Sequence, residues 1–237
     1  MRIGHISFRL AGTDGVSLET AKIAAVLARH GHQNFYFAGE LDAPNQAHRL
    51  LMPPLAGQVC VPAAHFTHPE AVWITSQAFG SPQAHPQLYE RIESLAQELS
   101  TALLGFIQDF DLQMLTIQNV FAIPLHLPLS IALMRVIQSS GIHAIAHHHD
   151  FYWEREAYRV NCVADILQTC FPPRLPNLRH VVINTQAQRA LDNLGIESSV
   201  LPNIFDFDMP VPQADAYNAD LRAGWLCLDG RRVVPVR

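Results

Sequence analysis

The chain has 237 residues, of which 49% are hydrophobic and 16% charged, a composition that lets a chain of this length fold without disulfide or metal staples. Its formal net charge is −5, from 16 basic and 21 acidic residues, and its Lys and Arg residues are not clustered. Because nucleic-acid binding depends on clustered basic side chains, the charge pattern argues against a nucleic-acid partner.

The lengths of the apolar runs, and the charged residues and prolines that interrupt them, bear on the cellular location. The first run breaks at Arg9 and Asp14, so it does not read as a signal peptide. The longest, residues 120–134, contains two prolines and a histidine and is shorter than the roughly 20 residues that span a bilayer. The four cysteines form no CxxC pair, as is typical of reduced cytosolic thiols. We therefore expect a soluble, cytoplasmic protein without a transmembrane segment.

Short apolar runs alternate with longer helical patterns, which is the signature of parallel βαβ units in an α/β fold. The expected strands, in chain order, are 3–8, 34–38, 71–75, 112–118, 142–147, 180–183 and 199–201. The expected helices are 16–30, 86–109 and 125–139, and Gly31 is placed to end the first of them in a left-handed conformation. Residues 210–219 have two prolines and little periodicity, so we predict one domain over 1–209 and a linker with the start of a second domain over 210–237.

Two glycines, Gly12 and Gly15, lie in the turn between the first strand and the first helix. Glycines allow close backbone approach to a ligand, and the N-terminus of a helix favours an anion. The spacing is G-x-x-G and not the G-x-G-x-x-G of dinucleotide-binding folds, so a tight turn without any ligand fits these residues about equally well.

Three histidines and an aspartate, His147 to Asp150, come where a strand should end. Ligands of open α/β sheets bind outside the carboxyl ends of the strands, which favours a functional role for at least one of these histidines. Side chains alternate along a strand, so the three cannot all point into one pocket. No second Cys or His pair has convincing ligand spacing, so we expect no metal site.

The segment that follows contains three aromatic residues and then Glu154 and Arg155. Tyr152 and its aromatic neighbours could wall a pocket in which Glu154 and Arg155 bind hydroxyl groups, or they could pack in the core at the start of a helix. Three asparagines also follow predicted strands, Asn119, Asn184 and Asn203. Each alone reads as a cap or turn residue, but their shared position at one sheet edge favours ligand binding.

Taken in chain order, these segments resemble the retaining glycosyltransferases of family 4 (group 1), which have two Rossmann-like domains in the GT-B architecture. The matching segments are 12–15, 118–119, 147–155, 182–185 and 201–206, and HHHDFYWER is the most specific of them. The resemblance implies a doubly wound, mostly parallel Rossmann-like sheet, the acceptor-binding amino-terminal domain of such an enzyme. It implies hexosyl transfer from a nucleotide sugar, without a metal or other cofactor, to an acceptor that the sequence does not identify.

Residue roles follow from the same resemblance. Gly12 and Gly15 would border the donor phosphates, His149 would orient the transferred sugar, and Asp150 would lie beside it. The remaining polar residues named above would bind the acceptor or the sugar: Asn119, Tyr152, Glu154, Arg155, Asn184 and Asn203. Near the end of the chain, Arg232 matches an arginine that neutralises the donor diphosphate in this family, and Arg237 stands where the family has a lysine.

The sequence stops at that point, so we expect a truncated copy that lacks most of its donor-binding domain. A separately encoded donor domain could complete it, and activity of the chain alone is left open. Two other hypotheses stay open at this stage. One is an NAD(P)-dependent oxidoreductase, with Glu40 as the acid that binds the ribose. The other is a non-catalytic module that binds a glycan or a protein partner.

Overall fold

The computed structural model describes residues 1–42, 55–203, 226–228 and 233–235. Contacts divide the chain into two units, Met1–Asn203 and Ile204–Arg237. The predicted boundary after residue 209 lies outside the described residues. In the second unit, strands β8 (Leu226–Leu228) and β9 (Val233–Pro235) pair antiparallel.

The first unit is an α/β fold with a seven-stranded, entirely parallel sheet in the order β3-β2-β1-β4-β5-β6-β7. Its strands are β1 (Arg2–Ile6), β2 (Gln33–Ala38), β3 (Leu55–Cys60), β4 (Met114–Gln118), β5 (His143–His148), β6 (Leu178–Val182) and β7 (Ser198–Val200). The helices are α1 (Gly15–Arg29), α2 (Pro69–Ala78), α3 (Leu88–Asp109), α4 (Leu127–Ser140), α5 (Ala164–Cys170) and α6 (Thr185–Asn193), with the 3₁₀ turns η2 (Pro62–Ala64), η3 (Tyr152–Glu154) and η4 (Glu156–Tyr158).

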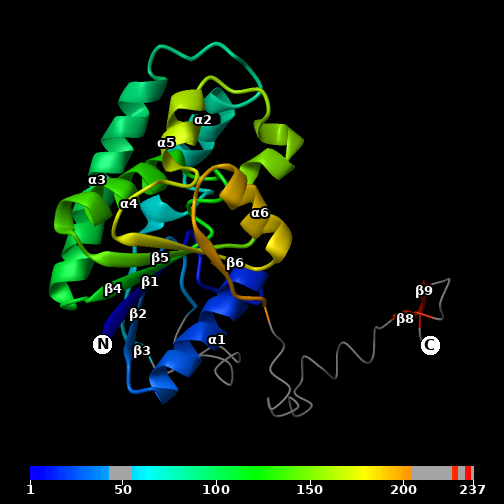
Figure 1. Ribbon diagram of the computed structural model, residues 1–237. Coiled ribbons are helices and arrows are strands. Elements are labelled where there is room, and N and C mark those ends of the chain that lie inside the picture. Colours follow the sequence, from blue (N-terminus) through cyan, green and yellow to red (C-terminus); the bar gives the residue numbers. More distant parts are fainter. Residues whose placement is uncertain (43–54, 204–225, 229–232, 236–237) are drawn as a thin grey trace. The chain divides into compact units, whose positions relative to one another are not determined.

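The sheet is doubly wound, as predicted. Helix α1 covers one face, whereas α3 and α4 pack on the other (Figure 1). The strand order reverses between β1 and β4, where α/β folds of this type bind ligands. No helix among the described residues is both long and apolar enough to cross a membrane.

The main core lies between the sheet and α3, whose buried residues recur at helical spacing: Leu88, Ile92, Leu95, Leu99, Leu103 and Phe106. Close packing there depends on Gly4 of β1, because a Cβ on this residue would come within 2.8 Å of the Phe106 ring. The opposite face of β1 is polar. His5 lies 2.9 Å from Asn34 Oδ1 and 2.7 Å from Thr116 Oγ1, and Asn34 donates to the Ala24 carbonyl of α1.

One predicted strand is wrong. Residues 71–75 lie in helix α2, which Pro69 begins and which buries Ala71, Ile74 and Ala78 on one face. The neighbouring strand is instead β3, whose residues alternate between half-buried and exposed and so carry a weak hydrophobic signal. The other predicted strands and helices are confirmed within a few residues, and Gly31 has the expected positive φ of 78°.

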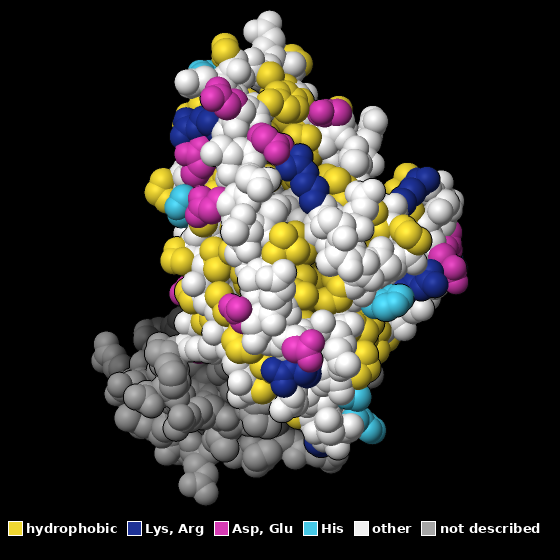
Figure 2. Space-filling model, turned by 90° about the vertical axis from the view of Figure 1, so that its left-hand side faces the viewer, with side chains coloured by type: hydrophobic (Ala, Val, Ile, Leu, Met, Phe, Trp, Pro, Cys, Tyr) yellow, Lys and Arg dark blue, Asp and Glu magenta, His cyan; other side chains and the backbone are white. Residues whose placement is uncertain are grey.

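The next feature is the distribution of charged side chains on the surface. Figure 2 shows one face of the molecule, on which most Lys and Arg side chains lie next to acidic ones. Among the exposed pairs are Arg135 with Glu93, at 2.7 Å, and Arg159 with Glu156, at 3.9 Å.

Candidate functional site

The candidate site lies at the carboxyl edge of the sheet, at the switch point between β1 and β4. The chain turns away after both strands, and the Ser7 hydroxyl donates to the Gln118 carbonyl at 3.3 Å, so the two strand ends are held together. The turns after β1, β4, β5, β6 and β7 all open at this edge, which is where the predicted glycines, histidines and asparagines occur.

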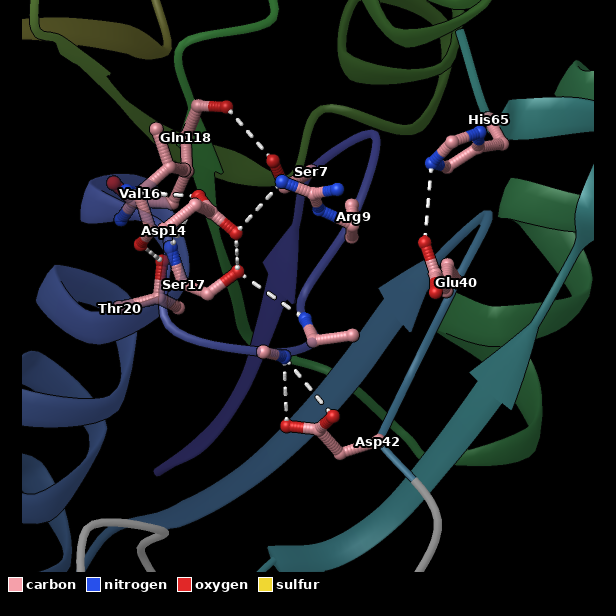
Figure 3. Close-up of polar contacts among 12 residues, drawn as sticks. Ser7, Arg9, Asp14, Val16, Ser17, Thr20, Glu40, Asp42, His65 and Gln118 are labelled. Atoms are coloured by element: carbon pink, nitrogen blue, oxygen red, sulfur yellow. Dashed lines mark hydrogen bonds and ion pairs between the residues drawn. The ribbon is translucent and has the colours of Figure 1, made fainter. Parts of the chain in front are cut away.

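The glycine turn after β1 is closed by a carboxylate. Gly12 has a φ of 71°, which a side chain would strain, and it leads into Asp14 at the N-cap of α1. Asp14 accepts hydrogen bonds from the backbone N–H groups of Val16 and Ser17, at 3.1 and 3.2 Å, and from the Ser17 hydroxyl at 2.7 Å (Figure 3). The N-terminus of α1 is therefore already satisfied by a side chain of the turn.

A second carboxylate occupies the other side of the same turn. Both Asp42 oxygens lie 3.0 Å from the Gly12 nitrogen, which donates to them (Figure 3). Arg9 offsets part of this negative charge through an ion pair with Asp14 at 3.2 Å. The sequence fitted an anion-binding turn and a tight turn without a ligand about equally well, and the structure shows two aspartates bound to the amides of this turn. A phosphate at this turn would have to replace Asp42 or lie beside it with Arg9.

Asn119 connects the ends of β4 and β5. Its side-chain oxygen accepts from the His149 backbone N–H at 3.0 Å, and its amide nitrogen donates to Asp150 at 3.1 Å. Its own N–H donates to the His147 carbonyl at 2.8 Å, with the residue at a φ of 62°. Both functional atoms of the predicted sugar-binding side chain are thus used to fix the turn after β5.

The three histidines alternate as the strand geometry requires. His148 points into the core, where its Nε2 lies 3.0 Å from His180 Nδ1 and its ring stacks on the His180 ring. His147 and His149 share the other side, with ring centroids 4.7 Å apart. His147 is buried and bonded to Gln118 Oε1, at 3.1 Å, which leaves His149 as the histidine at the sheet edge.

His149 is held in one tautomer by its neighbours. The Asn203 amide lies 3.3 Å from His149 Nδ1, and because an amide nitrogen only donates, Nδ1 accepts and the proton is on Nε2. Burial lowers the pKa of His149, whereas the charges of Glu19, Asp150 and Asp14 raise it. The ring is therefore neutral at pH 7. Its Nε2 atom is buried and has no hydrogen-bond partner among the described residues.

The aromatic segment after Asp150 forms one side of a cavity of about 420 Å³. Tyr152, Glu154 and Arg155 all line it, as the sequence suggested, but two of them also have structural roles. Glu154 accepts from the Phe151 N–H at 3.3 Å, and Arg155 Nε donates to Asp150 at 3.1 Å. Helix α5 supplies the opposite wall with Leu167 and Gln168, which no sequence motif indicated.

Other predicted residues have contacts of their own. Asn184 caps α6 and accepts from the Ala187 N–H at 2.8 Å, as an ordinary N-cap does. Glu40, proposed for the oxidoreductase hypothesis, lies after β2 with its carboxylate 3.4 Å from His65 Nε2. Arg232 and Arg237 lie outside the described residues. Within the described ranges, no three His, Cys, Asp or Glu side chains are grouped closely enough to hold a metal ion.

Comparison with known proteins places the chain beside two enzymes. It is 29% identical over 222 residues to the mannosylglucosylglycerate synthase of Petrotoga mobilis and 31% identical over 224 residues to that of Thermotoga maritima. Each alignment covers 92% of this chain and 48% of the relative, so the chain spans about half the length of the curated relatives it matches.

Family models and solved structures add little. No family model matches the sequence. Two crystal structures of a deacetylase from the teicoplanin biosynthesis pathway, one in complex with bog and one with teicoplanin, align over 61% of this chain. Their TM-scores are 0.40 and 0.39, at 12% and 13% identity, and they cover 65% and 68% of the deacetylase chains.

Proposed function

We propose that this chain is the acceptor-side domain of a retaining glycosyltransferase of family 4, with GT-B architecture. The observation that carries the proposal is the likeness to the two synthases, which extends over 92% of the chain. The relatives are named for a product containing mannose, glucose and glycerate. We infer that this chain likewise serves hexosyl transfer from a nucleotide sugar to a small sugar acid such as glucosylglycerate.

The geometry at the end of β5 suits this chemistry. The anomeric carbon gains positive charge as the leaving group departs, and a neutral imidazole tolerates that charge where an imidazolium would oppose it. Because Asn203 holds the proton on Nε2, His149 can donate one hydrogen bond to a hydroxyl of the transferred sugar, once the atoms that bury this nitrogen have moved aside. Asn119 fixes the backbone of His149 and the carboxylate of Asp150, so both groups are oriented before substrate binds.

The donor side needs residues beyond those described. The proposal requires a second domain, on this or another polypeptide, to hold the nucleotide and close the cleft against water. We infer that Arg9 and the glycine turn approach the donor diphosphate once Asp42 has moved off the Gly12 amide. We also propose that transfer needs no metal ion.

Transfer by a reconstituted enzyme tests this function. The carboxy-terminal half of the Thermotoga maritima synthase is expressed together with this chain or fused to it. Formation of a glycosylated product is then measured with UDP-glucose or GDP-mannose as donor and glucosylglycerate as acceptor, with EDTA present. We expect transfer that His149→Ala lowers at least a hundredfold, the usual size of one transition-state hydrogen bond, while the circular dichroism spectrum stays unchanged.

The control is His143→Asn, a change at an exposed residue that begins β5, at the opposite end of the strand from His149. It should leave the rate within twofold. Equal rates for His149→Ala and the wild type would remove His149 from the mechanism. Absence of transfer with every donor and acceptor tested, from a folded complex, would favour a non-catalytic glycan-binding module instead.

A further inference from the structure

The cavity beside the end of β5 has the size and position of a small-molecule site. Its volume of about 420 Å³ falls within the roughly 300–1,000 Å³ typical of ligand pockets. It lies between η3, η4 and the start of α5, and Arg155 joins it to Asp150, the residue after His149. A molecule bound in the cavity would contact Arg155, which also holds the Asp150 carboxylate.

An exposed but fixed tryptophan forms part of the wall. The side chain of Trp153 is 39% exposed, yet its ring stacks on the fully buried Phe151, with centroids 4.3 Å apart and planes 10° apart. Tyr152 packs against its edge at 5.2 Å. An indole held in this way offers a flat surface without losing further conformational entropy when a ligand binds.

The charges of the wall balance. Two carboxylates, Glu154 and Glu156, lie among two guanidinium groups, Arg155 and Arg159, so the four contribute no net charge. Glu156 and Arg159 are 3.9 Å apart, and both are mostly exposed. With Gln168 they provide hydrogen-bond donors and acceptors side by side. A diphosphate would face two carboxylates there, whereas a neutral polyhydroxylated ring can use both kinds of group.

We propose that this cavity binds the pyranose ring of the acceptor, with one face of the ring on the Trp153 indole. The C–H groups on a pyranose face are apolar and slightly positive, which suits the negative face of an indole. The hydroxyls at the ring edge then bind Glu156, Arg159 and Gln168. This assignment rests on the proposed function for its biological meaning, but binding itself can be measured on this chain alone.

The direct test follows the indole N–H signals of the 15N-labelled chain during titration with methyl β-D-glucopyranoside. The chain has three tryptophans, Trp73, Trp153 and Trp225, which single Trp→Phe substitutions assign. We expect a saturable shift of the Trp153 signal at millimolar glycoside and no shift of the Trp73 signal, because Trp73 lies on α2 beneath Arg91. Glycerol, which has hydroxyls but no ring face, should cause no saturable shift. An unmoved Trp153 signal at 100 mM glycoside, or an equal response to glycerol, would overturn the assignment.

Variants test sugar binding in the cavity separately from the proposed catalytic activity. Trp153→Phe should bind the glycoside within fivefold of the wild type, whereas Trp153→Ala and Gln168→Leu should each bind at least fivefold more weakly. Trp73→Phe is the matched control and should bind normally. In the reconstituted enzyme, Trp153→Ala should raise the KM for the acceptor with little change in kcat. An unchanged KM with normal transfer would contradict acceptor binding in this cavity but leave the proposed glycosyltransferase activity in place. Glycoside binding without any transfer would contradict the proposed activity but leave sugar binding in the cavity in place.

Discussion

At the scale of single residues, Asn119 has the turn role that its position after a strand indicates when the residue is taken alone. Its side chain, to which the family resemblance assigned sugar binding, is engaged by His149 N–H and Asp150. It also occupies the left-handed region, where asparagine is tolerated better than most residues. In the proposed enzyme, Asn119 is therefore a positioning residue for His149 and Asp150.

Two substitutions at Asn119 should separate the contribution of its backbone conformation to stability from that of its side-chain hydrogen bonds. Asn119→Gly keeps the left-handed backbone and loses two hydrogen bonds, which should cost about 1–3 kcal/mol of unfolding free energy. Asn119→Ala loses the same bonds and adds the strain of a positive φ, roughly 1 kcal/mol more. Urea denaturation measures both. If alanine were as stable as glycine, the backbone strain inferred for this residue would be absent.

The tautomer of His149 is a second property of a single residue that can be measured directly. Asn203→Leu removes the donor to Nδ1, so the ring should no longer be confined to the Nε2–H form. Nitrogen chemical shifts of the imidazole report this change without any substrate. Asn203→Gln, whose longer amide can still reach, is the control. An unchanged Nε2–H tautomer in the leucine variant would show that Asn203 does not set it.

At the scale of secondary-structure elements, the sequence predicted the sheet from its most buried strands. Buried runs such as 112–118 and 142–147 were unambiguous because both faces of these strands are covered. The region between β2 and α3 was ambiguous. Its run Ala-Val-Trp-Ile-Thr is rich in strand-forming residues, but the buried positions lie at helical spacing. Tertiary packing against α3 decides the outcome there.

The candidate site was predictable to a similar extent. Its location followed from strand ends, which placed Asn119 and His149 at one edge. Other members of the site did not follow, because Asp42 at the Gly12 amide, Gln168 in the cavity wall and the His180 ring against His148 come from other elements and carry no local motif. The sequence contains no signal for contacts of this kind, which depend on how the elements pack.

The junction of β2 with η2 gives a prediction at the same scale. A Cβ on Gly39 would lie 2.2 Å from the backbone nitrogen of His65, and backbone atoms at a packed junction cannot move aside as a flexible side chain does. Gly39→Ala should therefore destabilise the fold by about 3 kcal/mol or more. Gly15→Ala is the matched control, with no atom within 4 Å of the added Cβ, and should change stability by less than about 1 kcal/mol. Thermal denaturation of both variants decides whether this junction is as tight as the distances indicate.

At the scale of the whole molecule, the core of the described part of the chain contains five buried histidines. Burial lowers the pKa of His5, His126, His147 and His180 to about 4 each, and lowers that of the fully buried His148 as well. In the unfolded chain each has a pKa near 6.5. The unfolded state therefore takes up protons that the folded state cannot accept as the pH falls from 6.5 to 4.

Stability should consequently be complete above pH 7 and decline steeply as the pH drops below 6.5. Each such histidine contributes a slope of up to about 1.4 kcal/mol per pH unit. Against a total stability of roughly 5–15 kcal/mol, five together should unfold the chain before pH 4. Urea denaturation at intervals from pH 8 to 4 measures this slope. A stability that stayed constant from pH 7 to 5 would contradict the burial of these rings.

Carboxylates do not account for the same loss, because their effect falls in a different pH range. Hydrogen bonds from Arg91 and Arg135 lower the pKa of Glu70 and Glu93 below 4.5, so the stability from these pairs is lost only as the pH falls below that value. The decline between pH 6.5 and 5 therefore belongs to the histidines. His126→Asn, which retains a side chain able to cap α4, should make that decline shallower by up to about 1.4 kcal/mol per pH unit.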